Sequence, residues 1–207
     1  MLECGCTAGI RNREQRKALI PLLFINGLMF FIEFSLGIIS QSTALIADSV
    51  DMLADATVYG ISLYAVGRSV RTKINAARLS GAFQILLGFG VVADVVRRFV
   101  LGTAPEAMFM IIVGFLALAA NVLCLAIIAR HRKDEVHMRA SWIFSRNDVL
   151  ANAGVIIAGV LVSMLASPLP DLIIGLLIAV VVIHGGISIL RDARTYNENH
   201  VIGQEEI

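Results

Sequence analysis

The sequence predicts an all-α, polytopic membrane protein with six transmembrane helices and with both termini in the cytoplasm. Hydrophobic residues make up 57% of the 207 positions, above the roughly 45 to 50% that is usual in soluble domains. The mean hydropathy of +0.81 agrees with this class. Six apolar runs are each long enough to cross a bilayer, which needs about 20 residues in a helix.

The six runs follow one another with short connections. A turn without charge at 40–43 joins the first two runs, and 102–106, which contains Pro105, reads as another turn. Pro168 and Pro170 separate the last two runs. We expect helices over residues 18–40, 43–67, 79–101, 107–129, 140–166 and 171–190.

Charge placement predicts the orientation. All but two of the 17 Lys and Arg residues fall at the termini or in connections on the same side, and the exceptions are Arg97 and Arg98. The positive-inside rule then places both termini in the cytoplasm. We expect a cytoplasmic arm at 1–17, a six-helix transmembrane domain at 18–190 and a short cytoplasmic tail at 191–207. A multi-pass protein of the bacterial inner membrane, surrounded by lipid, is the expected setting.

The second run, TALIADSVDMLADATVYGISLYAVG, carries three carboxylates inside a stretch of spanning length. At about 100° per residue, Asp51 lies about 60° from Asp48 around the helix axis, and Asp55 lies within about 20° of Asp48. One ionised carboxylate at the centre of a spanning helix costs roughly 2.5 to 3.5 kcal/mol. We therefore expect this face to turn away from lipid and to meet counter-charges, protons or a metal cation.

Two other runs hold polar residues at helical spacing. Asn26 and Glu33 are seven apart in the first run, and Asp148 and Asn152 are four apart in the fifth. Oxygen ligands one turn apart on two helices can form a four-point site for a divalent cation. The predicted metal ligands are Asp51, Asp55, Asp148 and Asn152. Supporting or proton-relay roles are predicted for Asp48, Glu33 and Asn26.

The alternative for buried polar residues is hydrogen bonding between helices, and we favour it for Asn26, Asn121 and Gln84. Asp94 is expected to pair with Arg97 or Arg98, three and four residues further on. Cys124 is expected to be a small core residue, and His184 a hydrogen-bonded core residue. Possible peripheral metal ligands are Cys4, Cys6, His131 and His137, for which free thiols and a solvated loop are the favoured interpretation.

Residues 26–56, NGLMFFIEFSLGIISQSTALIADSVDMLADA, resemble the first two helices of the cation diffusion facilitator family. NDVLANAGVIIAG at 147–159 resembles the fifth helix of that family. The resemblance places Asp51, Asp55 and Asp148 on the metal-binding positions of the family. It implies a secondary transporter, not an enzyme, that exports divalent transition-metal cations by proton antiport.

The resemblance also implies the ligands and partners. Zinc is the expected substrate, with cobalt, cadmium, manganese or iron as other candidates. The metal is cargo rather than a prosthetic group, and no nucleic-acid partner is expected. A homodimer would form through membrane helices, because the 17 residues after Leu190 are too few for the cytoplasmic domain that family members commonly carry.

One ligand position departs from the family pattern. Phe144 stands where the family usually has His or Asp, four residues before Asp148. Without a histidine the predicted site contains only oxygen ligands, so manganese, iron or cobalt remain candidates beside zinc. A non-transporting metal-binding or regulatory membrane protein is therefore the alternative function. An intramembrane aspartyl protease is disfavoured, because the sequence Gly-Phe-Gly at 88–90 is not followed directly by Asp.

Overall fold

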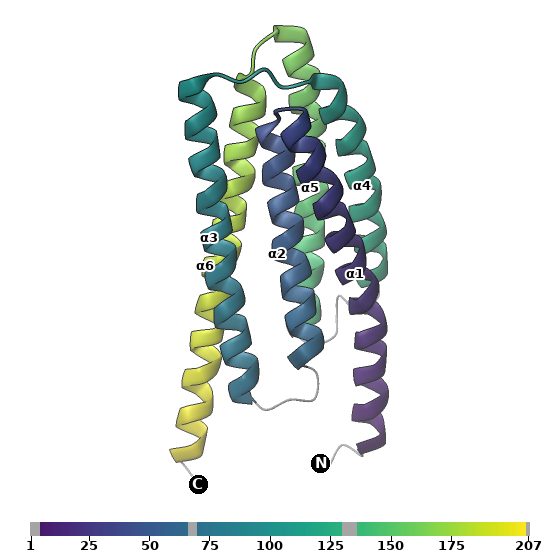
Figure 1. Cartoon of the computed structure of the whole chain (residues 1–207). Helices are drawn as coiled ribbons and strands as arrows, with labels where there is room; N and C mark the ends of the chain where they lie inside the picture. Colours follow the sequence, from purple (N-terminus) through teal and green to yellow (C-terminus); the bar gives the residue numbers. More distant parts are fainter. Residues whose placement is uncertain (1–4, 66–69, 130–135, 206–207) are drawn as a thin grey trace.

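The structure, a computed structural model, describes residues 5–65, 70–129 and 136–205. Within these ranges the chain forms helices joined by short turns, and no strand occurs there. Figure 1 shows the helices running up and down in one bundle, with both termini at the same end. The predicted all-α fold with six helices is confirmed. The helices are α1 (Gly5–Ile39), α2 (Thr43–Ala65), α3 (Val70–Leu101), α4 (Ala107–Ala129), α5 (Val136–Leu165) and α6 (Leu169–Glu205).

Helix α2 lies at the centre of the bundle. It packs against each of the other five helices, and Figure 1 shows it between α1 and the α3–α6 pair. The other helices each contain a stretch that is long and apolar enough to cross a membrane. Although α2 is long enough to span, with 23 residues, its carboxylates reduce its hydropathy. Its central position shields that polar face from lipid.

The outer surface of the bundle is apolar, as expected for a protein surrounded by hydrocarbon. Large side chains such as Phe24, Phe31, Phe99 and Met164 are between 67% and 76% exposed. The polar residues are inside: Asn26, Glu33, Asp48 and Asn121 are each at most 1% exposed. This reversal of the usual distribution fits a chain whose surroundings are lipid rather than water.

Helices α3 and α6 run side by side along much of their length (Figure 1). A Cβ atom added at Gly81 of α3 would lie 2.8 Å from the carbonyl oxygen of Gly186 on α6. Such a separation is shorter than real Cβ contacts allow, so the close approach of these backbones requires glycine at this position.

Several helices are longer than the apolar runs that predicted them. Helix α4 has the predicted bounds, whereas α1 begins at Gly5 and α6 continues to Glu205. Hydropathy marks only the part of a helix that lies in hydrocarbon. Backbone hydrogen bonding continues into adjoining polar residues when no breaker intervenes. The described parts of the predicted arm and tail are thus extensions of α1 and α6.

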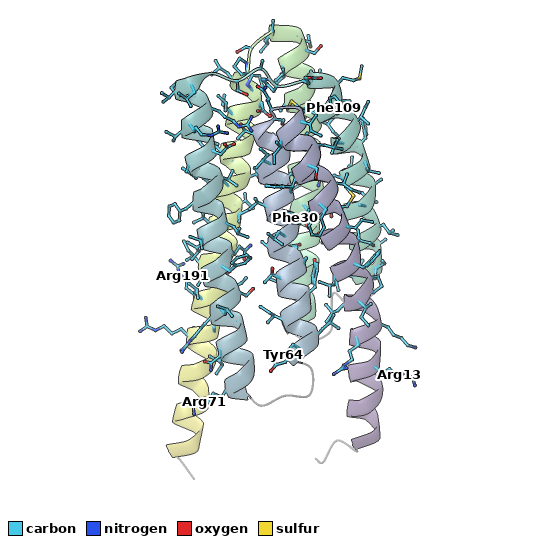
Figure 2. All side chains as sticks on the ribbon, viewed as in Figure 1. Arg13, Phe30, Tyr64, Arg71, Phe109 and Arg191 are labelled. Atoms are coloured by element: carbon cyan, nitrogen blue, oxygen red, sulfur yellow. The ribbon has the colours of Figure 1, made fainter. Side chains whose placement is uncertain are left out.

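The two ends of the bundle differ in charge. Figure 2 shows Arg13, Arg71 and Arg191 in the half that contains the chain termini. We call this half the terminal end, and we call the opposite end, which contains the turns at 40–42, 102–106 and 166–168, the loop end. By the positive-inside rule the terminal end is predicted to face the cytoplasm.

At the loop end, Asp171 on α6 caps the N-terminus of α2. Its carboxylate accepts hydrogen bonds from Ser42 Oγ at 2.6 Å, the Thr43 amide at 2.7 Å and the Ala44 amide at 3.0 Å. These amides have no acceptor within α2, and the helix dipole favours a negative charge there. One turn later on α6, Gly175 packs directly against the backbone of Thr43. Together these contacts hold the start of α2 against α6.

Arg98 of α3 holds the other side of the same turn. Its guanidinium donates to the carbonyl of Gln41 and pairs with Asp94 at 2.6 Å. Thr103, in the next connection, also donates to the Gln41 carbonyl, at 3.0 Å. Asp94 forms a second ion pair with Arg97 at 2.6 Å, which confirms the predicted pairing of Asp94. The turn between α1 and α2 is therefore held by α3 and α6 at once.

The prediction for His184 is wrong, whereas that for Cys124 is confirmed. His184 is exposed on α6, because the inward face of that helix is formed by its neighbours Val182 and Gly185. Cys124 is fully buried among apolar side chains that include Leu22 and Ile128.

The cap formed by Asp171 generates a stability prediction. Replacing Asp171 with Ala leaves two buried amides and a hydroxyl without their acceptor, so the free energy of unfolding should fall by about 1 to 3 kcal/mol. Thermal unfolding of the purified protein in detergent measures the effect. Asp192→Ala, which removes an exposed carboxylate from the same helix, is the matched control. Equal midpoints for the two variants would contradict the capping role.

Candidate metal centre

Three carboxylates meet at the contact between α2 and α5. Asp51, Asp55 and Asp148 each offer an oxygen atom, and these three atoms lie within 4.8 Å of one another. The side chains are 7%, 3% and 6% exposed, respectively. The structure thus brings together residues that are almost 100 positions apart in the chain. We refer to them below as the Asp triad.

Helical periodicity explains how each helix presents its part of the triad. Asp51 and Asp55 are one turn apart on α2 and share a face. On α5, Asp148 lies on the same face as Val155 and Val162, seven and fourteen residues further on. Both valines belong to the buried core that also includes Leu45 and Val50 of α2. Burial of this apolar face therefore carries Asp148 to α2.

The triad has an excess of negative charge. No described Lys or Arg forms an ion pair with any of its carboxylates. Two ionised carboxylates about 4.8 Å apart repel by about 3 kcal/mol at an effective dielectric constant of about 20. Three such pairs are too costly to remain uncompensated in a buried site. The arrangement requires a bound cation, or protons that neutralise part of the charge.

Neighbouring polar groups orient the triad. The hydroxyl of Tyr59, which is fully buried, donates to Asp55 Oδ2 at 3.2 Å. The side-chain amide of Asn152 donates to the backbone carbonyl of Asp148 at 2.7 Å. This bond leaves Asn152 Oδ1 buried without a donor, and Asp148 Oδ2 is also without one. Unsatisfied acceptors on adjacent turns of α5 are the atoms that a cation would require.

The predicted supporting residues fall into two groups. Asn26 donates to the Leu22 carbonyl at 3.0 Å and contacts Cys124 Sγ at 3.7 Å, which agrees with a role in packing α1 against α4. Glu33 and Asp48 are buried and interact directly with each other. Asp51 is close enough for its charge to act on Glu33 as well. These two acids therefore lie next to the triad. Asn26 contacts Cys124, which itself lies within reach of the charge of Asp55, and the supporting role of Asn26 remains a prediction.

Several predicted residues lie outside what the structure describes. Cys4 and His131 fall in segments that are not described, and the side chains of Cys6 and His137 are also outside the described residues. The same holds for the side chain of Phe144, although the backbone of α5 places this residue one turn before Asp148. The peripheral metal ligands remain predictions.

One functional residue was missed by the sequence reasoning. Asp171 has no place in the predicted site, yet it fixes the start of the helix that carries Asp51 and Asp55. The available signal was an acid immediately after Pro168 and Pro170, at the first turn of an apolar run. Such a residue commonly binds helix amides, but the helix to which it binds is not encoded locally.

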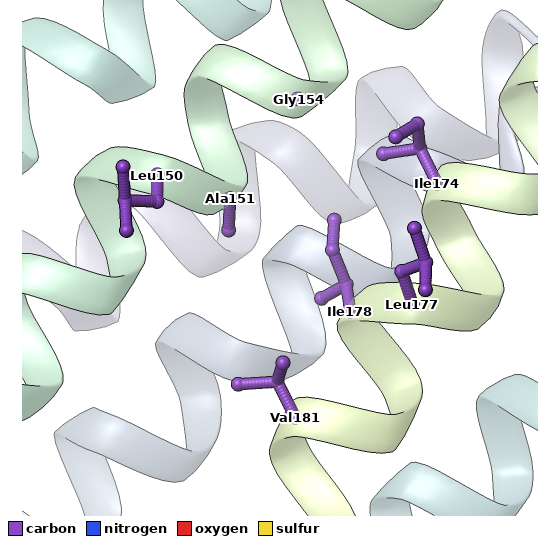
Figure 3. Close-up of a pocket in the computed structure, with 7 residues that line it drawn as sticks. All are labelled: Leu150, Ala151, Gly154, Ile174, Leu177, Ile178 and Val181. Carbon is purple, nitrogen blue, oxygen red and sulfur yellow. The ribbon is translucent and has the colours of Figure 1, made fainter.

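A cavity of about 320 Å³ lies between α5 and α6 (Figure 3). None of the residues that line it carries a polar side chain, so it offers no ligand for a cation. Leu150, on its rim, is 62% exposed and lies on the lipid side of α5. The cavity is an apolar groove separate from the triad. Its lining residues are Leu150, Ala151, Gly154, Ile174, Leu177, Ile178 and Val181.

Comparison with known proteins assigns the family. The cation efflux transmembrane domain matches residues 19–196, which is most of the chain. The chain belongs to the cation efflux family. The resemblance seen in the first, second and fifth helices is thereby confirmed. Members of this family are membrane transporters, so the multi-pass membrane fold is confirmed as well.

Relatives of this cation efflux protein include transporters from bacteria and yeast. The cadmium, cobalt and zinc/H(+)-K(+) antiporter of Bacillus subtilis is 24% identical, over 87% of this chain and 62% of the relative. Zinc transporter ZitB of Yersinia pseudotuberculosis is 26% identical, over 86% and 61%. The vacuolar zinc transporter ZRC1 of Saccharomyces cerevisiae is 28% identical, over 62% and 32%. The chain spans about three-fifths of the length of the first two relatives.

A cross-linking experiment tests the convergence of α2 and α5. With the three native cysteines replaced by alanine, Asp55→Cys combined with Asp148→Cys should be joined by a short thiol-specific cross-linker, because the native oxygens lie within 4.8 Å of one another. Mass spectrometry of the digested protein detects the link. Asp55→Cys with Leu150→Cys is the matched control, since Leu150 points away from α2. Equal yields for both pairs would contradict the described contact.

Proposed function

We propose that this chain exports divalent transition-metal cations from the cytoplasm in exchange for protons, and that zinc is its principal substrate. Asp51, Asp55 and Asp148 bind the cation in this proposal, and Asn152 is the fourth ligand. The observation that carries the proposal is the meeting of three buried carboxylates on two helices, where no Lys or Arg among the described residues compensates their charge. Membership of the cation efflux family and the printed activities of the relatives support it.

Proton exchange follows from the same electrostatics. When the cation leaves, three carboxylates within 4.8 Å of one another remain in a buried site. Taking up protons removes the repulsion and prepares the empty site for its return to the other side. A carrier that alternates between a cation-bound and a protonated state would couple the two fluxes without a further energy source.

The ligand set bears on the choice of metal. Carboxylate oxygens bind zinc at about 2.0 to 2.2 Å, and the same ligands suit manganese, iron and cobalt. Histidine would favour zinc, and its usual position in the family is occupied by Phe144. Zinc, cadmium and cobalt are named in the relatives, so we place zinc first and the other metals after it.

The proposal also covers assembly and location. We place the chain in the bacterial inner membrane as a homodimer that forms through membrane helices. The exposed apolar side chains on the outer helices support contact with lipid or with a second copy, and two of the relatives named above are bacterial. Native mass spectrometry in lipid nanodiscs tests the assembly, and a monomer alone would contradict it.

Phe144 at a usual ligand position favours a second candidate function, which is metal binding without transport. A protein that has lost one ligand could bind metal in the membrane without transporting it, and could serve a regulatory role. Calorimetry that detects metal binding, combined with the absence of any flux, would favour this function over transport.

Transport by purified protein in proteoliposomes tests the main proposal. Under an imposed pH gradient, zinc flux should fall by more than about tenfold in Asp51→Ala, because one triad carboxylate is removed. Asp192→Ala is the control and should transport at the wild-type rate, since Asp192 is exposed outside the site. Unchanged flux in Asp51→Ala would exclude the Asp triad as the transport site.

Restoring histidine at position 144 tests the metal preference. The backbone places this residue one turn before Asp148, so Phe144→His should add a nitrogen ligand and raise zinc affinity relative to manganese. Phe144→Leu removes the aromatic ring without adding a ligand and is the control. Competition between the two metals, followed by calorimetry, gives the ratio of affinities. The same ratio in both variants would show that position 144 does not reach the cation.

A further inference from the structure

A second pair of acids, for which the sequence predicts a supporting or proton-relay role, lies beside the Asp triad. Glu33 comes from α1 and Asp48 from α2, and their carboxyl groups interact directly. They are 0% and 1% exposed. Apart from the other acid of the pair, no described hydrogen-bond donor reaches either oxygen of Glu33 or reaches Asp48 Oδ2. A fully buried carboxyl group whose only polar partner is a second carboxyl group is rare, because leaving such groups unsatisfied costs free energy.

The pair lies on the loop-end side of the triad. Asp48 precedes Asp51 by three residues, which corresponds to about 4.5 Å along the axis of α2 toward the loop end. Glu33 is six residues from the end of α1, and Asp48 is five residues from the start of α2. Glu33 and Asp48 therefore lie at similar distances along the bundle from the turn that connects α1 and α2. An ion that moved from the triad toward the loop end would meet this pair next.

The negative charge of the pair would be stabilised by a cation. Neither carboxylate has a described basic partner, and both Asp48 and Asp51 act on Glu33 with the same sign of charge. Two carboxylates from separate helices offer up to four oxygen atoms, which is a chemistry suited to divalent cations with water as the remaining ligand. Fewer protein ligands than in the triad imply weaker binding.

We propose that Glu33 and Asp48 form a second cation-binding position, which receives the transported ion after it leaves the Asp triad. This inference rests on the proposed transport function and extends it from one site to two consecutive sites. Consecutive sites of unequal strength allow an ion to be bound selectively and still be released, as in multi-site conduction. The contacts of Asp171 and Arg98 lie beyond the second position, at the loop end.

The number of bound ions tests this inference directly. Equilibrium dialysis with zinc would use the full chain in nanodiscs, with the possible peripheral ligands Cys4, Cys6, His131 and His137 replaced by serine. This parent protein should bind two equivalents, one tight and one weaker. Glu33→Gln and Asp48→Asn should each lose the weaker equivalent and keep the tight one. Retention of the tight equivalent also reports that these variants are folded.

The control variants separate this inference from the proposed function. Asp192→Ala should bind both equivalents, whereas Asp51→Asn should lose the tight one. A single equivalent in the parent protein would overturn the second position. Binding of the weaker zinc equivalent by both Glu33→Gln and Asp48→Asn would also overturn it. The same holds if these variants change only the number of protons released when zinc binds. Each of these outcomes leaves the triad intact as the transport site, provided that Asp51→Ala lowers the zinc flux as predicted above.

Spectroscopy with manganese provides an independent test of whether the two bound cations lie close together. At two equivalents, two Mn²⁺ ions in adjacent positions should broaden each other's electron paramagnetic resonance signal, and Glu33→Gln should restore the narrow spectrum of a single ion. A spectrum of isolated ions at two equivalents in the parent protein would contradict adjacent sites.

Discussion

The need to keep the charges of α2 away from lipid governs the arrangement of the bundle. Carboxylates cannot face hydrocarbon without a cost of several kcal/mol, and α2 carries three of them on one face. The protein meets this constraint by surrounding α2 with all five other helices. The more apolar helices form the outer layer, and their aromatic and aliphatic side chains are exposed on the outside of the bundle. A polar interior is thus obtained at the centre of an apolar surface.

The loop end determines where α2 stands within this surround. Asp171 binds the first amides of α2 from α6, and Arg98 binds the preceding turn from α3. Because α3 and α6 pack tightly on each other, the start of α2 is fixed to a paired unit rather than to one helix. The position of Asp51 and Asp55 along the bundle follows from these contacts. A displacement of α6 relative to α2 at this end would have to break buried hydrogen bonds.

Local patterns predicted the fold and the position of the acids well. Hydropathy gave the helices, and a period of 3.6 residues placed Asp51 and Asp55 on one face and Asp148 with Asn152 on another. The pairing of Asp94 was predictable because its partners are three and four residues away. The contact of Asp171 with Ser42 joins residues 129 positions apart, so no local pattern contains it. His184 was misjudged because an apolar run does not reveal which of its faces is turned inward.

The central claim is that carboxylates from α2 and α5 hold one doubly charged cation between them. Anomalous X-ray scattering at the zinc absorption edge, measured on crystals of the zinc-loaded protein, locates the ion directly. We predict a peak between Asp51, Asp55 and Asp148, with oxygen atoms of these residues at about 2.0 to 2.2 Å from the ion. A loaded crystal whose zinc peaks all lie away from these three carboxylates would contradict the account.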